Sequence, residues 1–244
     1  VRVHLFVELF SAAKCLASRY RPVGRRLGII ANGGGPGVLA ADWVNEISLE
    51  LGRLSPESIN AFQPQLSPLA SLTDLIDLSE HATPEDYQAA IEAADKDRQI
   101  DGVLAIYSPR PGTDPDAVAH ALATAKQRMG KPLLSCWMGD ATVATGRSTL
   151  KAANIPTFRT PEAAVGAFGN IASFYQNQQL LQQTPPPLSS LAKPDIEGAR
   201  LVIESALAER RNILTEMESK TLLAAFHIPV TQTILARSAH EAMM

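Results

Sequence analysis

The chain has 244 residues, of which 45% are hydrophobic and only 5% aromatic, so a folded core must consist mainly of Ala, Leu, Ile and Val. Its 22 basic and 25 acidic residues give a net charge of −3, which excludes the basic surface of a nucleic-acid reader or a protein that binds anionic membranes. Neither a membrane span nor a signal peptide is recognisable, so we expect a cytoplasmic protein.

Both ends of the sequence have the pattern of interrupted domains. Residues 5–16 carry apolar side chains at helical spacing without an initiator Met before them. Residues 222–244 begin a helix, a turn and a strand and then stop. We therefore expect a fragment of a longer protein.

Strand-like and helix-like segments alternate from residue 27 to residue 182, which is typical of an α/β fold with a doubly wound parallel sheet. The first strand, 27–31, precedes a helix over 36–50 with Val38, Leu39 and Val44 expected on its buried side. The expected strands that follow are 51–54, 75–78, 102–107, 132–137 and 157–158. A capping residue followed by Pro predicts helix starts at Ser55, Thr83, Asp114 and Thr160, and a further helix is expected over 142–153.

Three successive prolines, Pro185–Pro187, mark a change in composition. They cannot continue a helix and favour an extended linker. We expect a first domain over 1–184, a linker over 185–194 and the start of a second domain over 195–244. Helices are expected over 195–208 and 215–226 in the second domain.

A glycine-rich turn, Asn32–Gly37, stands between the first strand and its helix. Glycine permits positive φ and close approach of a ligand, and a helix N-terminus favours an anion. We expect a phosphate-binding loop in which Gly35 needs a positive φ, and the alternative is a tight turn without a ligand. A nicotinamide or flavin is disfavoured because the acidic residue that would hold a ribose is expected about 20 positions after the loop, where Leu54, Ser55 and Pro56 stand instead. The loop residues are Asn32, Gly33, Gly34, Gly35 and Gly37.

The other reactive residue types form no recognisable catalytic centre. His81 has no accompanying nucleophile, and Ser135 lies in an apolar strand without the elbow motif of hydrolases. Cys15 and Cys136 are far apart and lack metal-ligand spacing, so neither a disulfide nor a metal site is expected. The acidic residues around Asp97 are interpreted as the solvated end of a helix.

Five segments, in this order, resemble NDP-forming acyl-CoA synthetases: 25–43, 101–109, 131–140, 152–168 and 218–230. In that family a CoA-binding domain and two flavodoxin-like domains of the succinyl-CoA synthetase type work with an ATP-grasp domain, and a phosphohistidine carries phosphate between sites. The resemblance implies that 1–184 is the second flavodoxin-like domain and that 195–244 begins ATP-grasp. It also implies that the loop 32–37 faces the phosphohistidine, whose segment lies outside the match.

A second family loop, usually Asn-Pro-Val-Asp-Leu, corresponds to residues 74–81 and makes Asp77 and Ser79 candidate site residues. Here Asp74 replaces Asn and Leu75 replaces Pro. Glu80 adds a further negative charge, so the loop is less suited to a carboxylate substrate.

Residues 174–187 resemble one branch more closely, the Pat-type bacterial protein lysine acetyltransferases, in which a GNAT domain is fused to this region. That resemblance implies a parent that binds acetyl-CoA and modifies protein substrates such as acyl-CoA synthetases. The alternative is a true ligase that uses CoA and ATP or ADP with Mg. Either parent would require CoA-binding and ATP-grasp domains, so the fragment itself is expected to be inactive. Exposed apolar residues after 212 predict a homodimer: Leu222, Leu223, Phe226 and Ile228.

Overall fold

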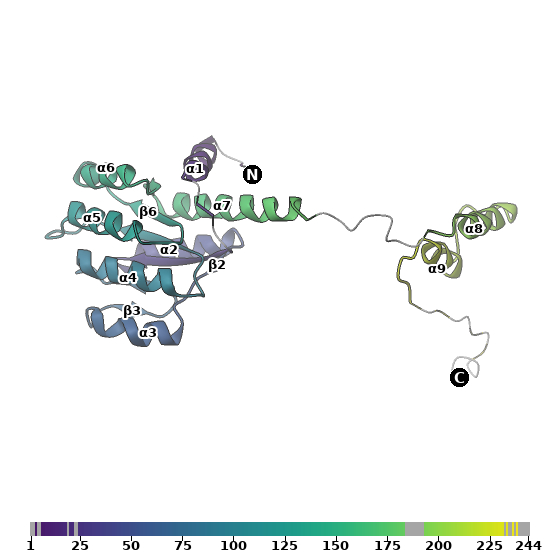
Figure 1. Ribbon diagram of the computed structural model, residues 1–244, viewed down its shortest axis with the longest axis horizontal. Coiled ribbons are helices and arrows are strands. Elements are labelled where there is room, and N and C mark those ends of the chain that lie inside the picture. The colour runs from purple at the N-terminus through teal and green to yellow at the C-terminus, as the bar shows by residue number, and fades with distance from the viewer. Residues whose placement is uncertain are drawn as a thin grey trace. The chain divides into compact units, whose positions relative to one another are not determined.

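The computed structural model describes residues 3, 6–18, 20–21, 24–183, 193–231, 233, 236 and 238. It divides into two compact units, Val1–Gln183 and Thr184–Met244, which are described separately here (Figure 1). The expected linker prolines, Pro185–Pro187, lie outside the described residues.

A parallel sheet is the centre of the first unit. Strand β1 (Arg26–Ala31) is paired on one side with β5 (Gly102–Tyr107), followed by β6 (Leu133–Trp137) and β7 (Thr157–Phe158). On its other side β1 pairs first with β2 (Glu50–Leu51) and then with β4 (Ile76–Asp77), so two short strands share one edge. Strand β3 (Ser71–Leu72), which the sequence does not predict, is antiparallel to β4. The order confirms the doubly wound α/β fold.

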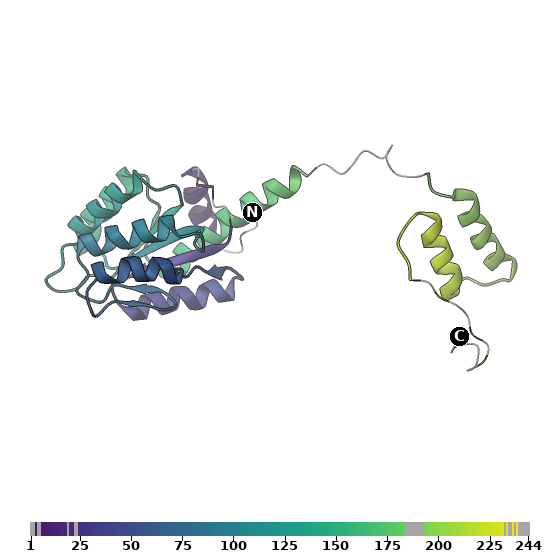
Figure 2. The ribbon, with the colours of Figure 1, turned by 60° about the horizontal axis from the view of Figure 1, so that its bottom comes forward.

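Helices cover both faces of this sheet (Figures 1 and 2). One face carries α1 (Phe6–Ala17), α2 (Gly34–Glu46) and α7 (Pro161–Leu181). The other carries α3 (Pro56–Phe62), α4 (Pro84–Lys96), α5 (Pro115–Lys126) and α6 (Ala144–Ala152), with short turns η1 (Gln63–Gln65) and η2 (Ala141–Val143). Ser55, Thr83, Asp114 and Thr160 all accept hydrogen bonds from backbone N–H groups at helix starts, as predicted.

Helix α2 buries a different side from the one expected. Its buried residues are Gly37, Ala40 and Val44, whereas Val38 and Leu39 are about half exposed. The reason is a close approach at Gly37, where an added Cβ would lie 3.3 Å from the Leu75 side chain. Small residues one turn apart therefore face the sheet, and the larger Val38 and Leu39 turn toward solvent.

Asp97 corrects the prediction of a solvated helix end, because this residue is only 3% exposed. One carboxylate oxygen accepts hydrogen bonds from the Ser55 N–H and hydroxyl at 2.7 and 2.8 Å, and the other accepts the Gln99 N–H at 2.8 Å. Burial alone would raise the pKa of Asp97, but hydrogen bonds from Ser58, Gln99 and Ser55 lower it to about 2. This carboxylate joins the start of α3 to the end of α4.

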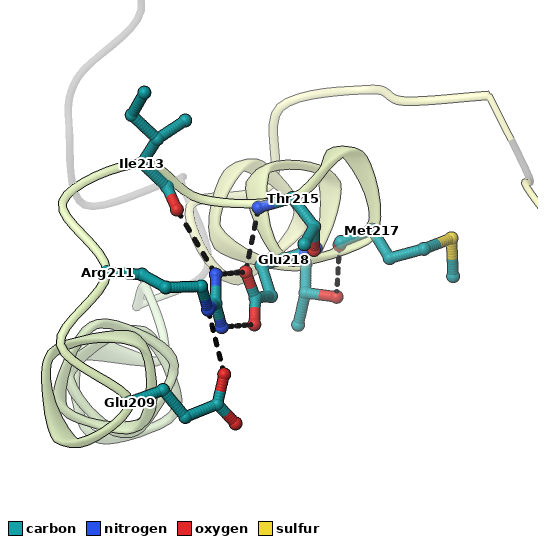
Figure 3. Close-up of polar contacts among 7 residues, drawn as sticks. Glu209, Arg211, Ile213, Thr215, Met217 and Glu218 are labelled. Atoms are coloured by element: carbon teal, nitrogen blue, oxygen red, sulfur yellow. Dashed lines mark hydrogen bonds and ion pairs between the residues drawn. The ribbon is translucent and has the colours of Figure 1, made fainter.

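The second unit contains helices α8 (Ile196–Ala208) and α9 (Glu216–Ala225), close to the predicted ranges. Figure 3 shows Arg211 between them, donating to Glu209 at 2.8 Å and to both oxygens of Glu218 at 2.9 and 2.6 Å. The hydrogen bonds from Arg211 and from the Thr215 N–H lower the pKa of Glu218 to about 2. The ion pair between Arg211 and Glu218 fixes the connection between α8 and α9.

Apolar side chains remain exposed on the second unit, including Leu223, Phe226 and Ile228. The expected homodimer through this set stays a prediction. Among the described residues no helix combines the length and apolar character that crossing a bilayer requires.

Candidate functional site

Three loops meet where the strand order of the sheet reverses. Strand β1 has β4 on one side and β5 on the other, and the chain leaves these strands at Asn32, Leu78 and Ser108. In doubly wound sheets, ligands bind at the carboxyl ends of the strands beside such a reversal. Topology therefore makes this edge of the sheet the candidate site.

Asn32 shapes the site by joining two of its loops. Its side chain is buried and both ends of its amide are used: Nδ2 donates to the Ser108 carbonyl at 2.8 Å, and Oδ1 accepts the Ser108 N–H at 2.7 Å. Each amide atom of Asn32 thus has one backbone partner, and this pair of bonds fixes the spacing between the loops after β1 and β5. The assignment of Asn32 to an anion-binding loop that acts through its backbone stays a prediction.

The glycines of the loop have three different roles. Gly33 has φ of +132°, which an L side chain rarely adopts, whereas α2 already begins at Gly34. The expectation that Gly35 needs a positive φ is therefore wrong, since Gly35 is helical and has open space around it. The N–H groups of Gly34 and Gly35 precede the first intrahelical hydrogen bond and are the available donors, while Gly37 packs against the sheet.

Asp77 occupies part of the expected anion site. Its Oδ1 accepts the N–H groups of Gly33 at 3.1 Å and of Ser79 at 3.0 Å. The second carboxylate oxygen lies 3.4 Å from where a Cβ on Gly34 would stand. The structure thus brings Asp77 and the glycine loop together, but a negative charge already lies at the start of α2 and one of its amides is taken.

Arg110 lies beside the glycine loop and was missed by the sequence analysis. Its Nη2 lies 3.6 Å from a Cβ placed on Gly33, and the structure records no carboxylate partner for it within the described ranges. A hollow of about 510 Å³ beside it is bounded by the loops after β4 and β5 and is also lined by Glu80, His81 and Asp114. An unpaired guanidinium next to free backbone donors favours an anion. The sequence gives no signal for this role, because Arg110 and Gly33 belong to loops that are far apart in the chain and come together only in the folded structure.

The remaining candidates have structural environments. Ser135 is buried and donates to Thr157 Oγ1 at 2.9 Å, and His81 is exposed, with Nε2 3.9 Å from Glu80. Cys15 and Cys136 are buried free thiols, and burial raises the pKa of each to about 12. The described residues include no cluster of three or more His, Cys, Asp or Glu side chains placed to hold a metal.

Comparison with known protein families gives two matches in chain order. The model of a Ligase-CoA domain matches residues 27–181, more than half of the chain, and that of an ATP-grasp domain matches residues 205–244. The fold is the succinyl-CoA-synthetase-like α/β fold that the sequence analysis expects.

Similar proteins are ligases. The chain is 28% identical over 96% of its length to acetate–CoA ligase [ADP-forming] I of Archaeoglobus fulgidus, covering 33% of that protein. It is 29% identical over 66% of its length to the alpha subunit of acetate–CoA ligase [ADP-forming] II of Pyrococcus furiosus, covering 36% of it. The dinucleotide-forming acetyl-coenzyme A synthetase 1 of Ca. Korarchaeum cryptofilum, in complex with phosphate and ADP, superposes with a TM-score of 0.68 at 26% identity, over 78% of this chain and 40% of that one.

These relatives overturn one prediction. They are acetate–CoA ligases, so the expected Pat-type acetyltransferase with a GNAT domain and protein substrates is wrong, and the ligase alternative agrees with them. The branch was inferred from residues 174–187, a short segment rich in Gln and Pro that carries little information about chemistry. The chain spans about a third of the length of the curated relatives it matches.

Proposed function

The chain belongs to the Ligase-CoA domain family, and from this premise we propose that it forms part of an NDP-forming acyl-CoA synthetase, an acid–thiol ligase. The observation that carries the proposal is the alignment of both units, in order, with one ADP-forming acetate–CoA ligase over 96% of the chain. CoA and ATP or ADP would be the cofactors, and CoA-binding and ATP-grasp domains the partners. The domains proposed here are 1–184 and 195–244, joined by a linker.

The first unit would receive a phosphorylated group at the start of α2. The N–H groups of Gly34 and Gly35, the helix dipole and the Arg110 guanidinium all favour negative charge there. A phosphohistidine presented by another domain meets these requirements, because its phosphoryl oxygens accept several hydrogen bonds at once. Stabilising that charge is what this part of the chain would contribute to phosphoryl transfer.

Asp77 and Ser79 would set the strength of this interaction. The Asp77 carboxylate holds Gly33 in its positive-φ conformation but also repels a dianion. Arg110 offsets this charge from the other side of the loop. A moderate affinity suits a phosphoryl group that must leave again. We assign no residue of this chain to the Mg²⁺ that would accompany a nucleotide.

The site is tested by titrating inorganic phosphate into the isotope-labelled chain and following its amide resonances by NMR. We expect the Gly34 and Gly35 amides to shift at millimolar phosphate, while those of β7 stay in place. If these amides do not shift, the loop is a structural turn without an anion site. The activity is tested on the complete gene product, where ATP, CoA and acetate should yield ADP, inorganic phosphate and acetyl-CoA. Acetyl transfer to proteins without formation of ADP and phosphate would overturn the ligase proposal.

A further inference from the structure

The loop after β5 brings Arg110 to the glycine loop, and a tight turn gives the loop after β5 its shape. The Thr113 N–H donates to the Arg110 carbonyl at 3.2 Å, three residues back in the chain. Pro111 and Gly112 occupy the two central positions, and Gly112 has φ of +84°. Pro at the first central position and a positive φ at the second are typical of a type II turn. Arg110 is therefore the first residue of a turn that Thr113 closes.

The Thr113 hydroxyl adds three hydrogen bonds to this turn. Its oxygen lies 2.8 Å from the Arg110 carbonyl oxygen, 3.2 Å from the Arg110 backbone nitrogen and 2.7 Å from the Tyr107 hydroxyl oxygen. A hydroxyl has one proton to donate and can accept two hydrogen bonds. Since its proton goes to the Arg110 carbonyl, the Arg110 N–H and the Tyr107 hydroxyl are the two donors to it. The hydrogen-bonding capacity of the Thr113 hydroxyl is thus fully used.

Tyr107 connects the turn to the core of the first unit. It is the last residue of β5, it is fully buried, and its ring stacks on the Trp137 ring with 4.7 Å between the ring centres. Burial raises the pKa of Tyr107 above its ordinary value, so the hydroxyl stays protonated at neutral pH and can donate to Thr113. The Thr113 hydroxyl therefore joins a ring that is fixed in the core to the backbone of Arg110.

The turn matters for the site because little else holds Arg110 in place. The residue is exposed, and no carboxylate is paired with its guanidinium in the part of the chain that the structure describes. A long side chain on a freely moving loop would be distributed over many conformations, and ordering it on binding would cost entropy. A fixed backbone at Arg110 limits where the guanidinium can lie and keeps its Nη2 near Gly33.

We propose that Thr113 is a positioning residue of the phosphate site: its hydroxyl, held by Tyr107, keeps the turn in the conformation that places the Arg110 guanidinium beside Gly33. Thr113 acts through Arg110 and is not itself a ligand of the phosphoryl group. The inference rests on the proposed function for its ligand, a phosphoryl group at the start of α2. The position of Arg110, however, can be measured without any ligand.

Three threonine substitutions separate positioning from a general loss of hydroxyl hydrogen bonds. Thr113→Val removes the hydroxyl and keeps the branched shape, whereas Thr113→Ser keeps the hydroxyl. Thr124→Val is the matched control, because Thr124 is exposed on α5 and its hydroxyl donates to the His120 carbonyl at 2.9 Å. The same substitution there also removes a hydrogen bond to a backbone carbonyl, but away from the loop. Circular dichroism checks that each variant is folded.

The position of Arg110 is measured first, by NMR on the isotope-labelled chain without phosphate. Since Arg110 Nη2 lies 3.6 Å from a Cβ placed on Gly33, we expect a nuclear Overhauser effect between the Arg110 guanidinium protons and the Gly33 Hα protons. It should be present in the unsubstituted chain, in Thr113→Ser and in Thr124→Val. It should be lost in Thr113→Val, where the turn lacks the bonds to the hydroxyl.

The affinity for inorganic phosphate is measured second, by the titration described above. Thr113→Val should weaken phosphate binding about three- to tenfold, as much as Arg110→Ala does, while Thr113→Ser and Thr124→Val should stay within about twofold of the unsubstituted chain. In an Arg110→Ala background Thr113→Val should have no further effect. Both substitutions then remove one and the same interaction, so their effects do not add.

Tyr107→Phe tests the anchor without a change in the loop itself. It keeps the ring that stacks on Trp137 and removes only the hydroxyl that donates to Thr113. We expect the Overhauser effect between Arg110 and Gly33 to weaken and phosphate affinity to fall, each by less than in Thr113→Val. If Thr113→Val does not fold, Tyr107→Phe takes its place in both measurements, and an unchanged Tyr107→Phe variant would then count against the proposal.

The proposal is overturned if Thr113→Val keeps the Overhauser effect between Arg110 and Gly33, if the unsubstituted chain lacks it, or if Thr113→Ser loses it completely. It is also overturned if Thr113→Val weakens phosphate equally with and without Arg110, because Thr113 would then act by another route. A chain that shows the Overhauser effect but binds no phosphate would refute the phosphate site of the proposed function. The measurement without ligand would still decide whether Thr113 positions Arg110, so the two failures are distinguishable.

Discussion

Asn32 and Ser108 exchange two hydrogen bonds between the loops after β1 and β5, with the Asn32 amide donating to the Ser108 carbonyl and accepting its N–H. The two residues are 76 positions apart in the sequence. Both bonds run between a buried side chain and backbone, so the pair holds the two loops at a fixed distance where the candidate site lies. Its loss would leave polar atoms without partners.

Asn32→Ala should therefore lower the free energy of unfolding by about 2 kcal/mol, because the Ser108 N–H and carbonyl lose their partners. Urea unfolding followed by circular dichroism measures this. Ser108→Ala is the control, since both bonds use the Ser108 backbone and its hydroxyl donates to Met138 Sδ at 3.5 Å, a long bond to a weak acceptor. If the two variants lose equal stability, the exchange of bonds is not what stabilises the loops.

Gly33→Ala and Gly35→Ala should behave differently although they lie two residues apart. Gly33 has φ of +132°, so a Cβ should cost about 1–3 kcal/mol in free energy of unfolding. Gly35 is in the first turn of α2 with open space, so Ala should change stability by less than about 0.5 kcal/mol. Thermal unfolding of both variants is the measurement. Equal destabilisation would contradict the roles assigned to the two glycines.

Arg110→Ala should weaken phosphate binding about three- to tenfold in the NMR titration, because it removes the cation beside Gly33. Arg110→Lys should retain part of the affinity, since it keeps the charge but loses the planar fork. Arg98→Ala, which removes an exposed arginine after the end of α4, should leave the titration unchanged. Identical losses in the Arg110 and Arg98 variants would mean that net charge alone determines binding.

Asp97→Asn should change how stability depends on pH. The pKa of Asp97 is about 2 in the folded chain, below its usual 3.8, so the carboxylate stabilises the fold above about pH 4 and this contribution is lost as the pH falls through 2. At about pH 6 we expect the free energy of unfolding of Asp97→Asn to be about 2 kcal/mol lower than that of the unsubstituted chain. This difference should shrink as the pH falls toward 2.

Asp74→Asn is the control for that experiment. Asp74 pairs with Arg53 at 2.8 Å, but both side chains are more than half exposed, and such surface pairs add little stability. The free energy of unfolding of Asp74→Asn should equal that of the unsubstituted chain at every pH. A pH-independent difference for Asp97→Asn would show that its hydrogen bonds do not depend on the charge.

Local patterns in the sequence determined most of the elements. The apolar run at 102–107 predicted β5 to the residue, and a capping residue followed by Pro marked the starts of α3, α4, α5 and α7. These features depend on neighbours in the chain: a buried parallel strand needs a continuous apolar run, and a helix needs acceptors for its first N–H groups. The ordered motifs also placed the chain among the acyl-CoA synthetases, although they misassigned the branch.

Only the tertiary structure decided which polar groups meet. Asp77 caps the Gly33 N–H from 44 residues away, and Arg110 reaches the same glycine from the loop after β5. Asp97 was predicted to face solvent because the residues around it are charged, yet packing of α3 against α4 buries it among donors. Side-chain exposure and charge pairing depend on the strand order and on the distance between loops, and neither is encoded in the spacing of residues along one segment.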